Sequence, residues 1–331
     1  MTSIELLRGL ELCANWADDD LLAVARLGAE RRFDAGSLLL RQGDPAIQAF
    51  AIAQGEVAVL RTLPGGGELM LAQKGAGVLV GELGLLAAQP RSASVRALSP
   101  VHSVMFERSV FTAACRMRQP AARRLLLAVM GFVCGRLREL LLHLTKNFPA
   151  AEAPCALAVG VTHGDFNYRQ FLHLLRCATA LGDVGLTAFA DRASPHTLSK
   201  GETLLVPGST APGLWLVVRG ALETVAGAEP HAATLEVLGP GSLAGLPSVM
   251  DGLPLVAGVR AREHSLVLHL AQAEFERACE SLDDFAFGLL HAVAEQLAGS
   301  LPRLSNRLAQ HTGLRRSQAI LARSAAAGVI A

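Results

Sequence analysis

The first third of the chain alternates short runs of apolar residues with breaks rich in glycine and proline. Runs of four to six residues with turn residues at both ends are typical of β-strands. Six runs fit this description: Ser37–Arg41, Phe50–Ala53, Val57–Arg61, Leu69–Gln73, Ser94–Ala97 and Val101–Phe106. Because many short strands at close spacing are typical of closed antiparallel architectures, the pattern favours a β-roll or jelly roll.

After residue 119 the apolar spacing changes to the helix period, which predicts a helix from Pro120 to about Lys146. Six apolar residues of this helix recur at alternating intervals of four and three: Leu126, Met130, Val133, Leu137, Leu140 and Leu144. Such a seam of heptad a and d positions is suited to a homodimer contact. An ordinary core helix has the same pattern over so few turns, so both interpretations stay open.

The glycine framework of the first half occurs a second time. Gly36, Gly43 and Gly55 each have a glycine 165 residues later, which is half of the 331-residue chain. Six further positions match at an offset of 164, among them Gly81 with Gly245 and Phe111 with Phe275. Because so many matches keep their order with only small shifts, we interpret the chain as one domain written twice.

The predicted fold is mostly β with flanking helices. It consists of two tandem β-rolls of the jelly-roll (double-stranded β-helix) type, each with N-terminal helices and a C-terminal helix. The expected division is residues 1–119 for the first roll, 120–146 for the apolar helix, 147–164 for a linker, 165–278 for the second roll, and 279–331 for C-terminal helices with a basic tail.

Composition narrows the class of protein. Hydrophobic residues make up 51% of the chain, and 30 basic residues face 29 acidic ones, which indicates a globular protein. The longest uncharged apolar stretch of helical character, residues 125–135, is shorter than a membrane span. No secretory signal is evident, so we expect a cytoplasmic protein without membrane contact. The cysteines and histidines lack metal-binding or catalytic spacing, so neither an enzyme nor a metal site is expected.

The candidate chemistry lies between two strands of the first copy, from Gly81 to Val95. Gly81 precedes a short helix, where backbone N–H groups approach an anion and the helix dipole favours negative charge. Arg91 supplies a cation with a planar fork that suits phosphate oxygens. Glu82 is placed to accept a hydrogen bond from a sugar hydroxyl. The segment therefore combines an anion cradle with a hydroxyl acceptor.

These residues resemble a known family. Gly-Glu-Leu-x-Leu-Leu followed by Pro-Arg-Ser-Ala-x-Val is similar to the phosphate-binding cassette of cyclic-nucleotide-binding domains, found in bacterial catabolite-activator proteins and in the regulatory subunits of cAMP-dependent protein kinase. The resemblance covers about residues 15–145. It implies that Arg91 holds the exocyclic phosphate oxygen and Glu82 the ribose 2′-hydroxyl. Gly81, Leu83 and Ser92 complete the cradle.

The resemblance also indicates the ligand. Serine after the arginine is similar to the bacterial cAMP receptors, whereas threonine there is associated with cGMP. Ser92 therefore favours cAMP, with cGMP as the alternative, and no other cofactor is implied. A competing interpretation is that Glu82 and Arg91 only form a structural ion pair inside the roll.

The second copy keeps the framework and loses this chemistry. Gly245 remains, but Leu246 stands opposite Glu82, Leu255 opposite Arg91 and Val256 opposite Ser92. A cyclic phosphate buried against leucine would lose its hydration without gaining a partner. We therefore expect no cyclic nucleotide here. A more apolar ligand is the alternative.

By the same resemblance, the helix at 120–146 both dimerises and covers the ligand. Between Arg108 and Arg138 the chain carries arginines but no acidic residue, which predicts either an electrostatic contact between halves or protomers, or a solvated helix face. The stretch 296–331 is also basic, and Leu308–Ile320 faintly resembles a helix-turn-helix core.

Three functions follow from these features. The leading hypothesis is a cAMP-responsive signalling protein, in which ligand binding in the first roll rearranges the 120–146 helix and the second roll for an unidentified protein partner. One rival is a transcriptional regulator that binds DNA through the basic tail. Because this is the rival and not the leading hypothesis, nucleic acid is a less favoured partner than a protein. The other is an assembly protein with no functional nucleotide pocket.

Overall fold

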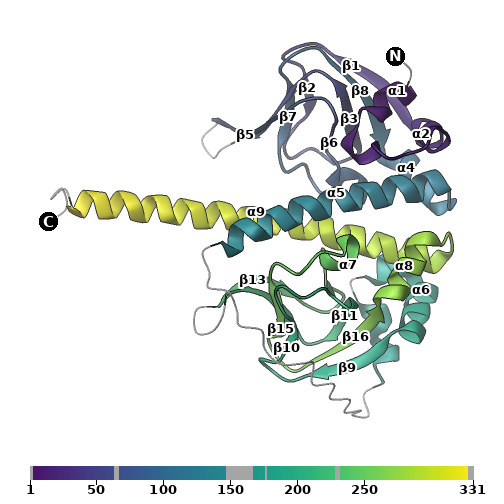
Figure 1. Ribbon diagram of the computed structural model, residues 1–331, viewed down its shortest axis with the longest axis vertical. Coiled ribbons are helices and arrows are strands. Elements are labelled where there is room, and N and C mark those ends of the chain that lie inside the picture. Colours follow the sequence, from purple (N-terminus) through teal and green to yellow (C-terminus); the bar gives the residue numbers. More distant parts are fainter. Residues whose placement is uncertain (1–2, 63–66, 147–166, 176, 228–231, 327–331) are drawn as a thin grey trace. The chain divides into compact units, whose positions relative to one another are not determined.

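The computed structural model describes residues 3–62, 67–146, 167–175, 177–227 and 232–326, with side chains as far as residue 308 (Figure 1). The backbone forms two compact units, and each contains one β-roll. Unit 1 comprises Met1–Val133, Thr179–Phe189 and Glu274–Ala298; unit 2 comprises Cys134–Ala178, Ala190–Ala273 and Gly299–Ala331. These units interleave along the sequence, unlike the sequential division expected above. The predicted linker at 147–164 lies outside the described residues.

The first roll is built from two four-stranded antiparallel sheets with the orders β1-β8-β3-β6 and β2-β7-β4-β5. Its strands are β1 (Gly28–Phe33), β2 (Leu38–Leu40), β3 (Gln48–Gln54), β4 (Val57–Thr62), β5 (Glu68–Lys74), β6 (Val78–Val80), β7 (Ser94–Ala97) and β8 (Val101–Glu107). All six predicted strands are present, with small differences at their ends. The prediction missed β1 and β6. The first of these has exposed polar residues at its centre, because it is an edge strand that pairs only with β8.

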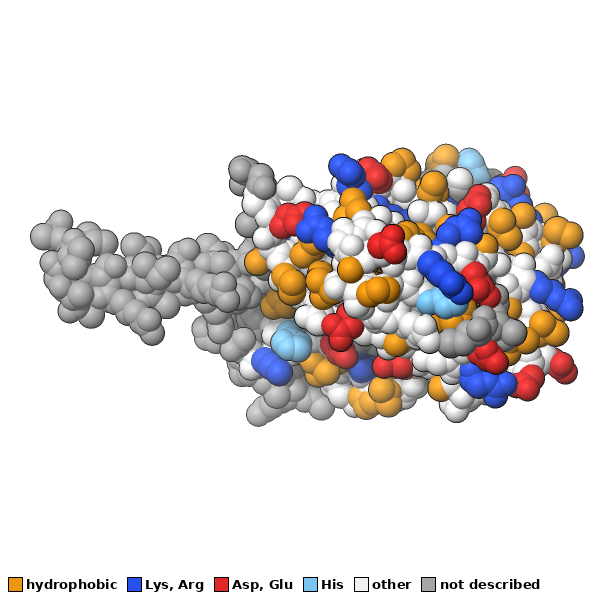
Figure 2. Space-filling view, turned by 90° about the horizontal axis from the view of Figure 1, so that it is seen from above, with side chains coloured by type: hydrophobic (Ala, Val, Ile, Leu, Met, Phe, Trp, Pro, Cys, Tyr) orange, Lys and Arg blue, Asp and Glu red, His pale blue; other side chains and the backbone are white. Residues whose placement is uncertain are grey.

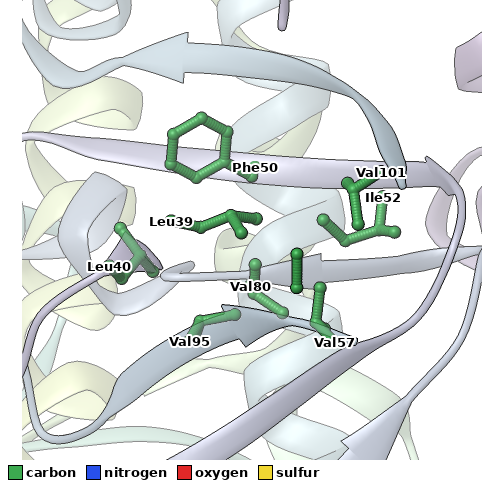
Figure 3. Close-up of a cluster of buried hydrophobic side chains, with 9 residues drawn as sticks. Leu39, Leu40, Phe50, Ile52, Val57, Val80, Val95 and Val101 are labelled. Atoms are coloured by element: carbon green, nitrogen blue, oxygen red, sulfur yellow. The ribbon is translucent and has the colours of Figure 1, made fainter. Parts of the chain in front are cut away.

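The core of the first roll is an apolar cluster enclosed by the two sheets (Figure 3). Phe50 and Ile52 project from alternate positions of β3, and the Phe33 ring contacts Phe50 edge-on with centroids 5.3 Å apart. The other buried members come from strands of both sheets: Leu39, Leu40, Val57, Val80, Val95, Ala97 and Val101. Period-two alternation thus places the predicted apolar residues on the inner face.

The second roll repeats this topology strand for strand. Its sheets have the orders β14-β11-β16-β9 and β10-β15-β12-β13. The strands are β9 (Ser194–Leu198), β10 (Thr203–Leu205), β11 (Gly213–Arg219), β12 (Leu222–Ala226), β13 (Ala233–Leu238), β14 (Leu243–Ala244), β15 (Gly258–Ala261) and β16 (Ser265–Ala271). Identical orders in the two copies confirm the predicted tandem jelly rolls.

Helices flank each roll. They are α1 (Ser3–Arg8), the 3₁₀ turn η1 (Glu11–Cys13), α2 (Asp18–Ala25), α3 (Leu83–Leu86), α4 (Arg108–Arg116), α5 (Pro120–Thr145), η2 (Tyr168–Leu174), α6 (Ala178–Arg192), α7 (Ser248–Asp251), α8 (Gln272–Glu280) and α9 (Asp284–Ala326). The predicted helix at 120–146 corresponds to α5. None of the described helices combines the length and apolar composition that crossing a bilayer requires.

Several arginines of the basic run near α5 bind partners within unit 1. Arg118 forms an ion pair with Asp284, Arg124 forms one with Asp20, and Arg123 donates to the Cys279 carbonyl at 2.7 Å. Residues distant in sequence are thus joined inside one compact unit. On the face shown in Figure 2, basic and acidic side chains are interspersed.

The second roll contains a stacked aromatic group where the first roll has Phe50. The Trp215 indole lies 4.2 Å from the His269 ring, centroid to centroid, and His196 contacts the indole edge-on at 5.2 Å. Burial lowers the pKa of both histidines, and for His269 the charge of His196 lowers it further. Protonation of either ring is therefore less favourable in the folded roll than in the unfolded chain.

The Gly55 turn between β3 and β4 provides a first prediction. Gly36 and Gly55 both have positive φ, at +86° and +89°, but only at Gly55 would an added Cβ approach another atom, the Pro100 carbonyl oxygen at 2.3 Å. We expect Gly36→Ala to lower the free energy of unfolding by about 1 kcal/mol and Gly55→Ala by about 3 kcal/mol or more. Urea unfolding followed by Trp16 fluorescence, in a Trp215→Phe background, measures the difference. Equal losses would contradict the role of the close approach.

The histidine pair predicts a pH dependence of stability. Because the pKa of each histidine in the folded roll lies below the ordinary histidine value of 6.5, the unfolded chain takes up more protons as the pH falls. The second roll should be fully stable above pH 6.5 and lose at most about 1.4 kcal/mol per pH unit per histidine below it. Trp215 fluorescence during urea unfolding, in a Trp16→Phe background, reports this loss.

The matched controls use the first roll and the surface. His269→Met introduces the residue that occupies the equivalent place in the first roll, Met105, and should flatten the acid slope. Replacement of the exposed His264 by glutamine should leave the slope as in the wild type. An unchanged slope in His269→Met would show that other groups cause the acid loss.

Candidate functional site

The candidate site lies in the connection from β6 to β7 of the first roll. This connection contains Gly81, the short helix α3 and the loop that leads to Arg91 and Ser92. Gly81 has φ +75°, a left-handed conformation that favours glycine. The Gly84 and Leu85 N–H groups bond to the Gly81 and Glu82 carbonyls, which closes the turn of α3.

Arg91 is the central residue of this connection. Its side chain is buried, with the residue 8% exposed, and its guanidinium donates to two backbone carbonyls: Gly81 at 3.1 Å and Gln48. Its backbone is tied to the loop before β3, because its N–H bonds to the Asp44 carbonyl at 2.9 Å and its carbonyl accepts from Gly43 at 3.0 Å. Both the guanidinium and its backbone are therefore held in place.

Two glycines leave the space that this guanidinium occupies. A Cβ at Gly81 would lie 2.8 Å from Arg91 Nη1, and one at Gly84 would lie 2.7 Å from the same atom. Both distances are too short for any real Cβ, so a side chain at either position would displace the arginine. The sequence pattern points to Gly81 but not to Gly84 or the Gln48 carbonyl. Gly84 leaves space for the guanidinium and the Gln48 carbonyl accepts from it, and both roles depend on where the guanidinium lies.

The electrostatics of the site are dominated by this buried cation. Burial lowers the pKa of the Arg91 guanidinium, and the nearby charges of Glu82 and Asp44 act in the opposite direction. Arginine still stays protonated, because its unperturbed pKa is so high. Among the described residues the side-chain hydrogen bonds of Arg91 go to the neutral Gly81 and Gln48 carbonyls, and the carboxylates of Glu82 and Asp44 supply the nearby negative charge.

The other predicted site residues surround Arg91 along the same connection. Glu82 immediately precedes α3 and is 5% exposed. Leu83 is half-buried, and Ser92 is exposed directly after the arginine. The segment thus has a buried cation, a buried carboxylate and an exposed hydroxyl within twelve residues.

The second roll has the same backbone arrangement with different side chains. The Leu255 N–H bonds to the Ser209 carbonyl at 2.8 Å, and its carbonyl accepts from Gly208 at 2.7 Å, as at Arg91. However, the Leu255 side chain is buried, and Leu246 and Val256 are half-buried. Ser248 occupies the place of Gly84. Gly245 has a positive φ of +104°, and an added Cβ would lie 2.8 Å from the Gly213 carbonyl oxygen. Both features favour glycine at this position.

The heptad seam of α5 is largely covered already. Leu126, Met130, Val133, Leu137 and Leu144 are each at most 5% exposed in the single chain, and Leu140 is half-buried. The chain itself therefore buries most of the face that the sequence assigned to a dimer contact. A role of α5 in dimerisation stays a prediction.

The predicted turn of the helix-turn-helix resemblance is absent from the backbone. Residues 308–320 lie within the single helix α9, which continues through Gly313. The faint helix-turn-helix resemblance of this stretch therefore has no counterpart in the described backbone. The glycine in this sequence is accommodated in a helix, which it weakens without breaking. The side chains of the tail arginines beyond residue 308 lie outside the described part of the chain.

The described residues contain no group of three or more His, Cys, Asp or Glu side chains that could hold a metal ion.

Comparison with known proteins places this geometry in a family. The chain is 25% identical over 158 residues to the HTH-type transcriptional regulator Cmr of Mycobacterium tuberculosis, which covers 46% of this chain and 65% of the regulator. It is 33% identical over 95 residues to the cGMP-dependent protein kinase egl-4 of Caenorhabditis elegans, 29% of this chain and 12% of the kinase. The chain thus spans less than two thirds of either relative.

Among solved structures, the regulatory domain of Toxoplasma gondii PKA in a co-crystal with cAMP matches with a TM-score of 0.32 and 18% identity. That match covers 94% of this chain and 96% of the other. A family model described as cyclic nucleotide-binding domain matches residues 30–118 and again residues 195–281. These two segments coincide with the two rolls and together exceed half of the sequence, and on this ground the chain belongs to the cyclic nucleotide-binding domain family.

Proposed function

We propose that this protein is a regulatory protein that binds one cyclic nucleotide, cAMP in preference to cGMP, in the first roll. The observation that carries the proposal is Arg91, a buried cation whose hydrogen bonds go to neutral carbonyls and whose space is left open by Gly81 and Gly84. The planar fork of N–H donors of Arg91 would bind the oxygens of a cyclic phosphate, whose negative charge would neutralise the guanidinium. Glu82 would accept a hydrogen bond from the ribose hydroxyl, a contact that free phosphate could not make.

The second roll, in this proposal, is a structural and regulatory partner that leaves the nucleotide to the first. With Leu255 in place of the arginine, a phosphate there would lose water without gaining a charged partner. Ligand binding in the first roll would change the conformational equilibrium of α5 and of the second roll. This change would alter the binding of a protein partner. Such an effect is limited by the difference in ligand affinity between the two states: a 100-fold difference corresponds to about 2.7 kcal/mol.

The names of the relatives do not decide the nucleotide, since one is cGMP-dependent and another holds cAMP. The preference for cAMP rests on Ser92 through the family resemblance. The rival hypothesis of DNA binding through the basic tail stays a prediction, although the helix-turn-helix resemblance within that tail has no turn in α9. A non-catalytic role agrees with a site made of one cation, one carboxylate and backbone groups.

The first test of this proposal concerns Arg91. We expect Arg91→Gln to weaken cAMP binding by roughly 100-fold or more, because it removes a buried, charge-assisted pair, and Glu82→Gln to weaken it less. Isothermal titration with cAMP, cGMP and cyclic dinucleotides measures both. Arg96→Gln is the matched control, since Arg96 lies on the adjacent strand β7 and pairs with Glu68 at the surface.

Two outcomes would contradict the proposal. Either no cyclic nucleotide binds to the wild-type chain, or Arg91→Gln binds as tightly as the wild type. In the latter case the Arg91 guanidinium has only a structural role in the roll.

The second test concerns the number of sites. We expect one molecule of cAMP per chain, and a Leu255→Gln variant should keep both this stoichiometry and the affinity, because the second pocket takes no nucleotide. The same titration provides the stoichiometry. Two bound nucleotides per chain, or an affinity that falls with Leu255→Gln, would show that the second roll also contributes a site.

A further inference from the structure

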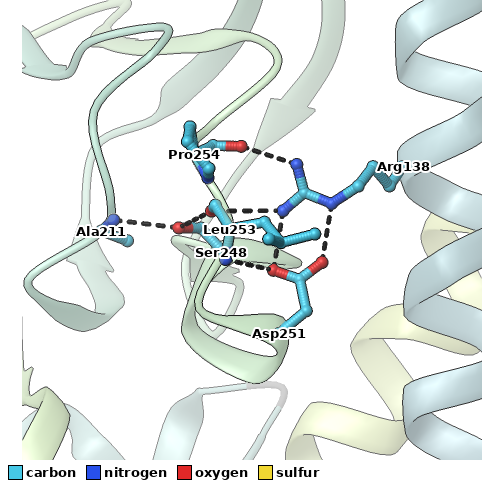
Figure 4. A network of polar contacts seen from close by, with 6 residues as sticks. All are labelled: Arg138, Ala211, Ser248, Asp251, Leu253 and Pro254. Atoms are coloured by element: carbon cyan, nitrogen blue, oxygen red, sulfur yellow. Dashed lines mark hydrogen bonds and ion pairs between the residues drawn. The ribbon is translucent and has the colours of Figure 1, made fainter.

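The C-terminal part of α5 places one arginine against the cassette of the second roll (Figure 4). Arg138 donates two parallel hydrogen bonds to the Asp251 carboxylate, from Nε to Oδ2 and from Nη2 to Oδ1, both at 2.7 Å. Nη1 also donates to the Pro254 carbonyl at 2.6 Å, and Nη2 to the Leu253 carbonyl at 3.3 Å. All these residues belong to unit 2. One guanidinium is thus bound by a carboxylate and two carbonyls.

The groups that receive Arg138 are held by bonds of their own. Asp251 Oδ1 accepts from the Leu253 N–H at 3.0 Å, and Ser248 Oγ donates to the Leu253 carbonyl at 2.7 Å. The same Ser248 oxygen accepts from the Ala211 N–H at 3.0 Å, which ties α7 to the loop before β11. Gly252, with φ +68°, lets the chain turn directly after α7. The acceptors are therefore arranged without help from Arg138.

This ion pair is less exposed than others that α5 forms. The Arg138 and Asp251 side chains are 13% and 23% exposed, whereas those of Arg124 and Asp20 are 42% and 32% exposed. A half-buried, bidentate pair is screened less by solvent and salt than a surface pair. Cys134, one turn before Arg138, is buried, and its thiol pKa is raised to about 12 by burial and, to a smaller extent, by the charge of Asp251.

The two cassettes carry charges of opposite sign, at different positions of the same connection. In the first roll Arg91 supplies a cation, and Ala87 stands where the second roll has Asp251. In the second roll Leu255 replaces the cation, and Asp251 with the Leu253 and Pro254 carbonyls forms a cluster of acceptors. The first cassette is therefore complementary to an anion, and the second to a cation with several N–H donors.

We propose that the second cassette is an arginine receptor, which binds the C-terminal part of α5 through Arg138 and so makes the second roll responsive to the position of this helix. The boundary between the two units falls within α5, between Val133 and Cys134. The receptor role rests on the contacts of Arg138. The responsive role rests also on the proposed function, since it needs nucleotide binding in the first roll to act on α5. By linkage, such an action is reciprocal.

The receptor is tested without nucleotide, by hydrogen exchange of the full-length chain. We expect Arg138→Gln and the nearly isosteric Asp251→Asn each to increase amide exchange in residues 134–145 by roughly tenfold or more, because each removes charge-assisted bonds. The double variant should exchange no faster than either single variant, since both remove the same interaction. Arg138→Lys, which keeps the charge but loses the fork, should lie between wild type and Arg138→Gln.

Arg124→Gln is the control on the same helix and should leave exchange at 134–145 unchanged. Unaltered exchange at 134–145 in both Arg138→Gln and Asp251→Asn would overturn the receptor. So would an increase spread evenly over the second roll, which would show that the pair stabilises the fold as a whole.

The responsive role is tested by adding saturating cAMP to the same proteins. We expect cAMP to change exchange at residues 134–145 at least about threefold in the wild type, and to have no such effect in Arg138→Gln. Nucleotide that binds to the first roll without changing exchange there would overturn this role. If no nucleotide binds at all, the proposed function fails, and the nucleotide-free exchange still decides whether the receptor exists.

Discussion

A guanidinium that is removed from water needs several hydrogen-bond acceptors in fixed places, and in each roll of this protein one such guanidinium lies at the same connection between strands. At Arg91 the acceptors are the Gly81 and Gln48 carbonyls, which are dipoles without net charge. These carbonyls compensate the loss of hydration only in part, and the nearby charges of Glu82 and Asp44 also favour the charged guanidinium. The absence of side chains at Gly81 and Gly84 is a condition for this arrangement, because either Cβ would overlap the guanidinium. The turn, the helix α3 and the loop before β3 all serve to keep one cation in place.

In the second roll the same backbone binds a guanidinium from outside the cassette. Leu255 has the backbone hydrogen bonds of Arg91, which shows that the architecture of the connection does not depend on the cation. What changed are a few side chains: a leucine for the arginine, a serine for Gly84 and an aspartate for Ala87. Ser248 uses the space that Gly84 leaves open in the first roll and supports the acceptor carbonyl of Leu253. A duplicated scaffold thus contains a buried arginine in one copy and, in the other, a group of acceptors that binds the guanidinium of Arg138.

The helix α5 connects these two kinds of site in the proposed function. Most of its heptad side chains are buried within the chain, so α5 resembles a packed core helix more than an open coiled-coil seam. A packed helix moves between discrete arrangements, because a close-packed interior does not deform continuously. A single bidentate pair such as Arg138 with Asp251 is of the size, about 1.5–3 kcal/mol, that biases such an equilibrium without fixing it.

The sequence alone determined the duplication and the jelly-roll class. The alternation of side chains along a strand depends only on neighbouring residues. The glycines mark turns, because glycine adopts a positive φ without steric cost. It also indicated which copy lost its chemistry, since Leu255 is directly comparable with Arg91. Strands β1 and β6 escaped detection, because the first is a polar edge strand and the second has only three residues.

The tertiary structure alone decided how the arginines are used. Arg138 resembles any polar residue on the flank of an apolar helix, and its partner Asp251 is 113 residues away. Burial of the heptad face is likewise an outcome of the whole chain. Patterns of spacing report the period of an element and the face that is apolar. Which surface covers that face, and which carboxylate meets a given cation, depends on contacts between segments far apart in sequence, and these exist only in the folded chain.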